Sequence, residues 1–435
     1  MKILMHILSF EWKILWRSQT LKVLLLVILG AGLYGIYFGK FEVEKQQARI
    51  AEVQAEQRQR FDSLLVWAQL DTTLEANRAK YARALMPSGS DYRTHSNYTV
   101  VNTPSATAGL CLGQRDLYPV YYNLNITDFA RKVNTGELAN PMKLLTGNFD
   151  LSYVIVFLLP LLIISLFYNL YSVEKEGGTL PLLRAQTVSL FTLLLGKSII
   201  RLFLIWGVGA ILLLLGFLLQ GVPLAATESG FFRWLGILLA YTTLWALVMV
   251  GVVALRRSSA LSAMLGLGLW LVFPLITPAL INLSVSAAQP LPNRAEVIHA
   301  VRTQNDKNWE MPKSYVLNQF YAAYPEYAEV DTTEFYPWYY ATFTVLDQEA
   351  QALKAVIDEQ VQECNAQMAR WEWLAPAAWV HERLAGLCHT DRQSQMAFLK
   401  EAQAYHEKIK DFYFARLYEG ASITLEDLRK LERGL

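Results

Sequence analysis

Residues 151–171 read LSYVIVFLLPLLIISLFYNLY, without a single charged side chain. A helix of about 20 residues crosses the hydrocarbon core of a bilayer, so this run is long enough to span one. Pro160 lies near its middle and leaves a backbone carbonyl without its helical partner. Neighbouring helices can satisfy such a group and lipid cannot, so we predict a packed helix bundle in a membrane.

Four other runs share this character, and together they predict five transmembrane helices. The spans are 21–39, 151–171, 198–220, 234–255 and 260–283. The composition agrees, because 53% of the chain is hydrophobic and only 18% is charged, whereas soluble domains carry about a quarter charged residues. The net charge of +1 creates no field that would attract nucleic acid, so nucleic acid is not expected as a partner.

Lysine and arginine predict the orientation of these spans. Basic residues gather before the first span, between the second and third, and between the fourth and fifth, at Lys2, Lys13, Arg17, Lys22, Lys175, Arg184, Lys197, Arg201, Arg256 and Arg257. The positive-inside rule then predicts a multi-pass protein of the plasma (inner) membrane, with the N-terminus cytoplasmic and the C-terminus outside. Arg201 starts the third span, and we expect its side chain to extend to the cytoplasmic headgroups.

Two large polar segments fall outside the cytoplasm in this topology. Residues 40–150 and 284–435 are predicted to form two mainly helical extracytoplasmic domains, and the fold class is an all-α polytopic membrane protein. A helical pattern continues the first span to about Leu85, and others cover about 341–373, 377–387 and 392–417. The aromatic run 335–340 indicates a packed domain core, with a binding surface as the alternative.

The first 20 residues form an amphipathic pattern. Lys2, His6 and Lys13 recur on one side at helical spacing, and Trp12 and Trp16 suit a headgroup boundary. We expect an interfacial helix on the cytoplasmic side, and the alternative is a plain extension of the first span.

Residues 172–197 read SVEKEGGTLPLLRAQTVSLFTLLLGK. Two acids precede a glycine pair, then Thr179 as a helix cap and Pro181 in a first helical turn. The pattern predicts a short helix, a break near 186–189 and a second apolar stretch. This is a rigid cytoplasmic elbow that displays carboxylates, which suits a soluble motor that pushes on it. The alternative is an ordinary loop with solvated charges.

This elbow resembles the coupling loop of ABC-2 type transporter permeases, the membrane subunits of bacterial ABC exporters. The likeness covers residues 140–201, and its most specific part is EKEGGTL at 174–180, followed by TVS at 187–189 and Gly196-Lys197. Residues 113–119, 373–377 and 384–391 resemble a subgroup with large extracytoplasmic domains. The resemblance implies a helix that docks on a separate ATPase, with the contact made by Glu174, Glu176, Gly177, Gly178, Thr179 and Leu180.

The resemblance also implies partners and a function. An ABC ATPase subunit would bind ATP and Mg, so this chain would hold no cofactor, no metal and no catalytic residue. ATP hydrolysis would be coupled to outward transport or to force transmission by a homodimer or heterodimer of permeases in contact with membrane lipid. Gly196-Lys197-Ser198 resembles the end of a P-loop, but Phe191 occupies the position of the required glycine.

Two alternatives stay open at this point. Family permeases have six spans, so a sixth helix would either follow this sequence or come from a partner. A membrane-anchored scaffold or sensor, whose outer domains bind an envelope partner, is the competing function. Among the three cysteines, Cys111, Cys364 and Cys388, the last two lie in one segment and are candidates for a disulfide, with three free thiols as the alternative.

Overall fold

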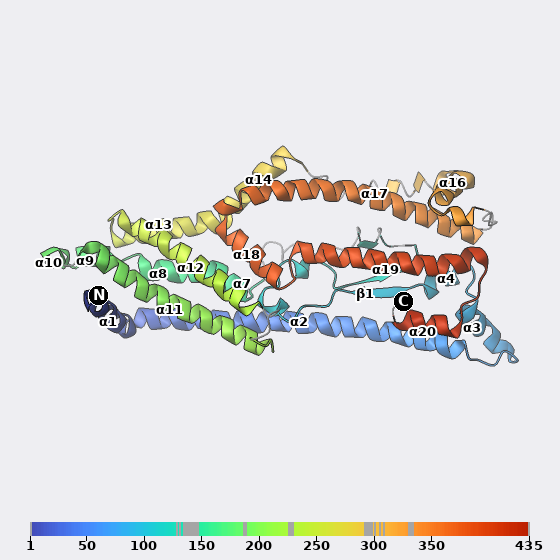
Figure 1. Ribbon diagram of the computed structural model, residues 1–435, viewed down its shortest axis with the longest axis horizontal. Helices are drawn as coiled ribbons and strands as arrows, with labels where there is room; N and C mark the ends of the chain where they lie inside the picture. Colours follow the sequence, from blue (N-terminus) through green and yellow to red (C-terminus); the bar gives the residue numbers. More distant parts are fainter. Residues whose placement is uncertain are drawn as a thin grey trace.

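The computed structural model describes residues 2–127, 148–185, 189–224, 230–290, 309–328 and 335–433, with a few isolated positions between them. The molecule is elongated and predominantly helical, and its elements follow the long axis (Figure 1). The described strands, β1 (Tyr98–Val101) and β2 (Tyr121–Leu124), form one antiparallel pair with Tyr98 opposite Leu124. The prediction of an essentially all-helical fold is therefore confirmed.

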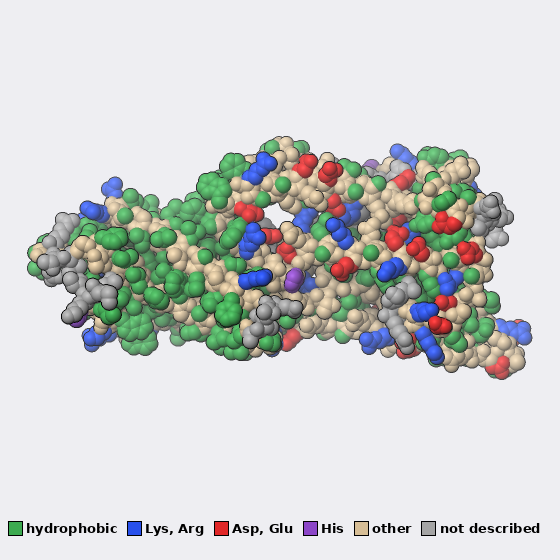
Figure 2. All heavy atoms as spheres, in the orientation of Figure 1, with side chains coloured by type: hydrophobic (Ala, Val, Ile, Leu, Met, Phe, Trp, Pro, Cys, Tyr) green, Lys and Arg blue, Asp and Glu red, His purple; other side chains and the backbone are tan. Residues whose placement is uncertain are grey.

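One half of the molecule is a bundle of apolar helices. Among the described residues, five helices are long and apolar enough to cross a membrane: α2 (Gln19–Trp67), the α7–α9 helix (Leu151–Glu176), α11 (Leu190–Leu219), α12 (Phe231–Ala254) and the α13–α14 helix (Ser259–Ala288). They cover the five predicted runs except for the last residues of two of them, Gln220 and Leu255, and α11 begins eight residues before 198. Figure 2 shows hydrophobic side chains over this half and most of the charge on the other.

The α7–α9 helix is the centre of this bundle. In its most apolar window 67% of the residues are buried, against 11% in the α13–α14 helix, which lies at the edge. The central helix consists of α7 (Leu151–Tyr153), a π-helical turn (Val154–Leu158), α8 (Leu159–Phe167) and α9 (Ser172–Glu176). The outer one consists of α13 (Ser259–Leu271), a second π-helical turn (Val272–Ile276) and α14 (Thr277–Ala288).

The π-helical turn before Pro160 shows how the bundle accepts a proline. A π turn widens the helix locally and leaves carbonyl groups short of partners. The Tyr241 hydroxyl of α12 donates to the Val156 carbonyl at 2.8 Å, and the Trp270 indole N–H of α13 donates to the Phe157 carbonyl at 2.9 Å. Neighbouring helices thus satisfy the freed carbonyl groups, as the sequence predicts.

Helix α2 joins the bundle to the rest of the molecule. Helix α1 spans Lys2–Arg17. The next residue, Ser18, caps α2, because its hydroxyl accepts a hydrogen bond from the Leu21 N–H at 3.3 Å. Helix α2 then continues unbroken for 49 residues, which is roughly 73 Å at 1.5 Å per residue. It leaves the bundle and runs along the other half (Figure 1), so the predicted continuation of the first span is confirmed as far as Trp67. The helix predicted to about Leu85 is interrupted at 68–74 and resumes as a separate helix at Glu75.

We call the other half the distal module. It contains the far part of α2, the two strands, and the helices α3 (Glu75–Leu85), α4 (Asp91–His95), α16 (Lys313–Ala323), α17 (Phe335–Arg370), α19 (Arg392–Glu419) and α20 (Leu425–Arg433). The predicted helices at 341–373 and 392–417 correspond to α17 and α19. The predicted helix at 377–387 is α18 (Pro376–Leu387), which instead packs against the bundle.

The distal module has one hydrophobic core that both outer segments share. Phe61 of α2 and Tyr92 of α4 lie in it with Tyr340 of α17 and Tyr413 of α19. The Tyr92 ring centroid is 6.2 Å from that of Tyr340 and 6.4 Å from that of Tyr413. The two segments that were predicted as outer domains therefore share this core, in which their aromatic side chains bury one another.

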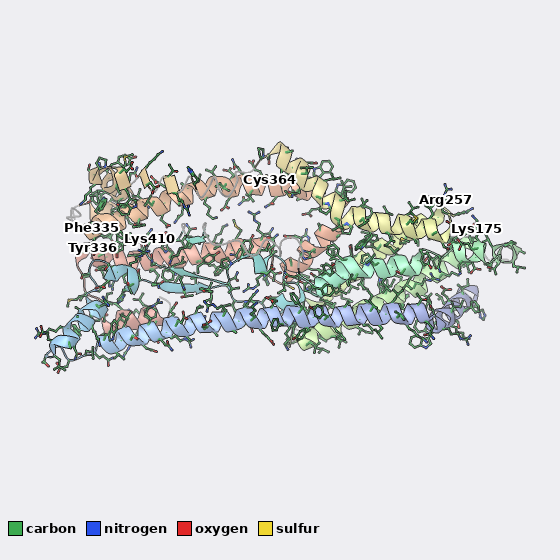
Figure 3. The ribbon with its side chains drawn as sticks, turned by 180° about the vertical axis from the view of Figure 1, so that it is seen from behind. Lys175, Arg257, Phe335, Tyr336, Cys364 and Lys410 are labelled. Carbon is green, nitrogen blue, oxygen red and sulfur yellow. The ribbon has the colours of Figure 1, made fainter. Side chains whose placement is uncertain are left out.

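The aromatic run 335–340 serves this core in part. Trp338 and Tyr340 are buried, as the core interpretation expects. Phe335 and Tyr336 are exposed at the end of the module far from the bundle (Figure 3).

Candidate functional site

The elbow lies at the tip of the bundle, opposite the distal module (Figure 1). It consists of α9 and α10 (Leu180–Ala185), joined by Gly177 to Thr179. Gly178 has φ of 73°, a left-handed conformation that glycine adopts without strain. The Thr179 N–H donates to the Glu174 carbonyl at 3.1 Å and its hydroxyl bonds the Glu174 carboxylate. The turn is therefore closed by its own hydrogen bonds, while the expected break near 186–189 lies largely outside the described residues.

Glu174 anchors the elbow to the third apolar helix. Its carboxylate accepts from the Lys197 ammonium of α11 at 2.6 Å, and the Lys197 side chain is almost fully buried. The pair is charge-assisted and shielded from water, which strengthens it relative to a surface pair.

Glu176 anchors the elbow to the fifth apolar helix. Its carboxylate accepts from the backbone N–H of Ser259 at 2.8 Å and from the Ser259 hydroxyl at 2.7 Å. Ser259 is the first residue of α13, so the negative charge caps the positive end of that helix. Both carboxylates thus have partners within the chain, an ammonium group and a helix N-terminus, and Glu176 is also exposed at the surface.

The remaining motif residues divide into anchored and exposed ones. Leu180 is buried in the bundle core, whereas Gly177, Gly178 and Thr179 are exposed. Three apolar side chains beside the motif are exposed: Val173 at 44%, Leu182 at 68% and Phe191 at 73% exposure. The sequence did not mark Val173 and Leu182 as exposed, because spacing along the chain does not distinguish an outward apolar side chain from a packed one.

A second ion pair ties α1 to the same end of α11. The Arg201 guanidinium donates to the Glu11 carboxylate at 2.9 and 2.5 Å, to Asn169 at 3.2 Å, and to the carbonyl of Leu166. Glu11 and Arg201 are both buried. The expected extension of Arg201 to the headgroups is therefore wrong, because a buried carboxylate offers the charge a partner within the bundle. The signal for it was Glu11, the only acidic residue before Glu42.

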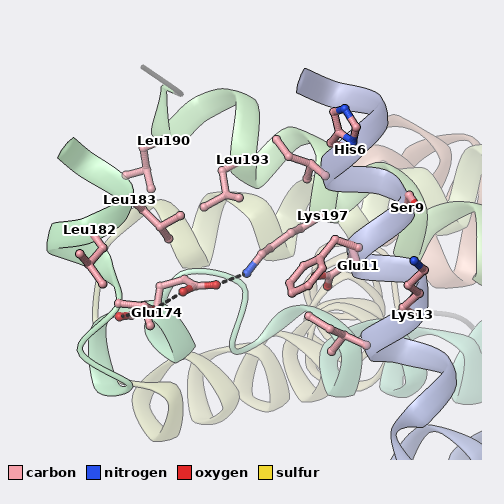
Figure 4. Close-up of a pocket in the computed structure, with 14 residues that line it drawn as sticks. His6, Ser9, Glu11, Lys13, Glu174, Leu182, Leu183, Leu190, Leu193 and Lys197 are labelled. Atoms are coloured by element: carbon pink, nitrogen blue, oxygen red, sulfur yellow. Dashed lines mark hydrogen bonds and ion pairs between the residues drawn. The ribbon is translucent and has the colours of Figure 1, made fainter. Parts of the chain in front are cut away.

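A groove lies between α1, the elbow and α11 (Figure 4). Its volume is about 690 Å³, and its wall combines the Glu174–Lys197 pair with apolar side chains of Phe10, Ile14 and Leu193. Gly196-Lys197-Ser198 lies inside helix α11 and not in a phosphate-binding loop. Among the described residues, no three His, Cys, Asp or Glu side chains are grouped to hold a metal. The site is suited to contact with another apolar surface.

The basic clusters of the sequence lie at this same end. Lys175 of the elbow and Arg257, between α12 and α13, are both found there (Figure 3), as is α1 (Figure 1). The grouping matches what the positive-inside rule requires of one membrane face. Which compartment that face meets stays a prediction.

Comparison with known proteins gives one match. Residues 294–433 match a family model described as a domain of unknown function, DUF3526. The matched region takes in α16 to α20. The elbow, at residues 172–185, lies outside it. No curated protein and no solved structure matches the chain.

Proposed function

We propose that this chain is the membrane-spanning permease subunit of an ATP-driven ABC-2 type exporter, with ATP hydrolysed on a separate subunit that docks at the elbow. One observation carries the proposal. The elbow stands at the tip of the bundle and is anchored twice, through Glu174 to Lys197 and through Glu176 to Ser259. Force applied to the elbow would therefore displace the third and fifth apolar helices and would not merely bend a loop.

The docking surface combines apolar contacts with positive charge. Val173, Leu182 and Phe191 are exposed, and Lys175 and Arg257 lie at the same tip. We infer an ATPase surface with an apolar cleft and an acidic rim, because apolar contact supplies affinity and charge complementarity supplies orientation.

Force has a continuous path from this end to the distal module. The Arg201–Glu11 pair couples α11 to α1, and the Ser18 cap couples α1 to α2. Helix α2 then enters the distal core through Phe61 and Leu64. This path favours force transmission to the distal module as the output of ATP hydrolysis, in preference to a scaffold that only anchors.

Tryptophan residues support a bilayer around the apolar half. Trp12 and Trp16 are exposed on α1, and Trp371, Trp373 and Trp379 are exposed where the bundle meets the distal module. Tryptophan favours both headgroup regions of a bilayer. The proposed location is the inner membrane, with the elbow cytoplasmic and the distal module outside.

Affinity purification from native membranes tests the proposal. We expect a tagged chain in mild detergent to recover an ATPase with Walker motifs, and Leu182→Arg to lose it. Leu74→Arg is the matched control, because Leu74 is equally exposed at the opposite end of the molecule. Glu176→Arg is a poorer test, since it also removes the cap of α13. Recovery of envelope proteins without any ATPase would reject the permease in favour of the scaffold.

A further inference from the structure

Two cysteines lie together where the bundle meets the distal module. Cys111 follows the 3₁₀ turn Ala108–Leu110, and Cys388 is the C-cap of α18. Both side chains are fully buried and belong to the core of the bundle. They come from the two outer segments of the chain, so only the tertiary structure brings them together.

Their backbones are fastened to each other. The Thr390 hydroxyl donates to the Cys111 carbonyl at 2.9 Å, and the Gln114 N–H donates to the Thr390 carbonyl at 3.0 Å. The Ser105 hydroxyl, six residues before Cys111, donates to the Cys388 carbonyl at 2.5 Å. Gly113 adopts φ of 52°, and a Cβ there would lie 2.8 Å from the Thr390 carbonyl oxygen. The two segments are therefore in close contact around Cys111 and Cys388, which the structure holds as two free, buried thiols.

The third cysteine is elsewhere. Cys364 lies on α17 (Figure 3), with its thiol 3.5 Å from the side-chain oxygen and 3.7 Å from the carbonyl oxygen of Gln289. The structure thus gives Cys388 the neighbour Cys111, in place of the pairing with Cys364 that their shared segment suggested.

The surroundings of the pair do not suit a metal. The nearby Asp150 carboxylate is occupied by the Leu112 N–H at 2.7 Å, the Tyr153 N–H at 2.9 Å and the Ser152 hydroxyl at 2.6 Å. Burial raises the pKa of the Cys388 thiol to about 12 and that of Cys111 well above its usual range. Thiolates are the metal-binding and reactive form, so the folded site disfavours both metal binding and slow oxidation in place.

We propose that Cys111 and Cys388 form a disulfide that joins the two outer segments of the chain at the end of the bundle that meets the distal module. The bond rests on the topology of the proposed function, which places both residues in an oxidising compartment outside the cytoplasm. Both thiols lose a proton and an electron, and a sulfur–sulfur bond forms. A cell-envelope thiol–disulfide oxidoreductase in its disulfide form accepts both electrons and both protons and becomes a dithiol. Because burial closes the site, this exchange precedes the final packing of α18.

The disulfide would resist mechanical force at the joint where the bundle meets the distal module. Helix α2 passes directly beside the same joint, where a Cβ at Gly39 would clash with the carbonyl oxygen of Gly109. The disulfide joins the Gly109 loop to α18, which packs on α12 and the central helix. Force carried along α2 then reaches the distal module without opening the joint.

Thiol mapping of the full-length protein in its native membrane tests the bond. Cells are quenched and membranes denatured in N-ethylmaleimide without reductant, then digested and analysed by mass spectrometry. We expect one cross-linked peptide pair that contains Cys111 and Cys388, separated by reductant, with maleimide on Cys364 alone. Cys364→Ser should keep the link, and Cys111→Ser should leave Cys388 labelled. Maleimide on both Cys111 and Cys388 of the unmodified chain overturns the proposal.

A companion measurement separates this result from the proposed topology. Leu74→Cys and Leu182→Cys place exposed thiols at the two ends, and intact spheroplasts are treated with a membrane-impermeant maleimide. Labelling at 74 and protection at 182, together with free Cys111 and Cys388, would reject the disulfide alone. Labelling at 182 and protection at 74 would reject the orientation as well, while ATPase recovery reports separately on the permease.

Discussion

The buried Glu11–Arg201 pair should be the most sensitive polar contact in the bundle. Glu11→Gln removes the carboxylate charge but keeps nearly the same volume, so packing of α1 on α11 is preserved. Arg201 then keeps Asn169 and the Leu166 carbonyl as partners, neither of which carries a charge. The guanidinium becomes an uncompensated buried cation.

The expected loss follows from the two bonds to Glu11 at 2.9 and 2.5 Å. Hydrogen bonds to charged groups contribute about 1.5–3 kcal/mol each, and breaking a buried pair on one side costs about 3–5 kcal/mol. We therefore expect Glu11→Gln to lower the free energy of unfolding by about 3 kcal/mol or more. The double variant Glu11→Met with Arg201→Met should recover most of this loss, because apolar side chains of similar volume replace a buried pair at little cost.

The assay is reversible denaturant unfolding in detergent micelles, followed by the fluorescence of the bundle tryptophans. Glu426→Gln is the control, since its partner Lys430 forms an exposed pair whose loss should leave the unfolding curve unchanged. A loss below about 1 kcal/mol for Glu11→Gln would refute the reasoning, because that is the range of surface pairs. A double variant as unstable as Glu11→Gln would also refute it.

Two further predictions concern stability. Burial lowers the pKa of His95 to about 4, although its bond to the Ala84 carbonyl and the charge of Asp91 oppose the shift. The pKa of histidine in the unfolded chain is near 6.5. The contribution of His95 to stability is therefore complete above pH 6.5 and is lost progressively as the pH falls to 4. The loss should reach about 2 kcal/mol at pH 5, and His95→Gln should flatten the dependence of unfolding free energy on pH; an unchanged slope would contradict a neutral buried imidazole. Tyr241→Phe should cost about 1–3 kcal/mol by leaving the Val156 carbonyl unsatisfied, measured by unfolding in micelles, whereas Tyr153→Phe, whose ring is only partly buried, should be near neutral.

Much of the architecture was readable from the sequence because it depends on local properties. The length and hydropathy of the run 151–171 predict a bilayer-length helix wherever it packs. The periodicity of 392–417 predicts a helix within two residues of the observed α19. In the elbow, Gly178 and Thr179 are recognisable because a left-handed turn and a helix cap each need particular residue types.

Only the tertiary structure decided which of these elements meet. Glu11 and Arg201 are 190 residues apart, and Glu176 and Ser259 are 83 apart. Periodicity predicts that a helix face is buried but not what buries it. The sequence therefore did not show that the two outer segments share one core, or which groups bind Glu174 and Glu176. The cysteines follow the same rule: Cys388 lies nearer to Cys364 along the chain, yet the turn into α18 directs it to Cys111. Charge pairing, shared aromatic burial and thiol contact are properties of three-dimensional neighbours, and the packing of the chain alone selects those.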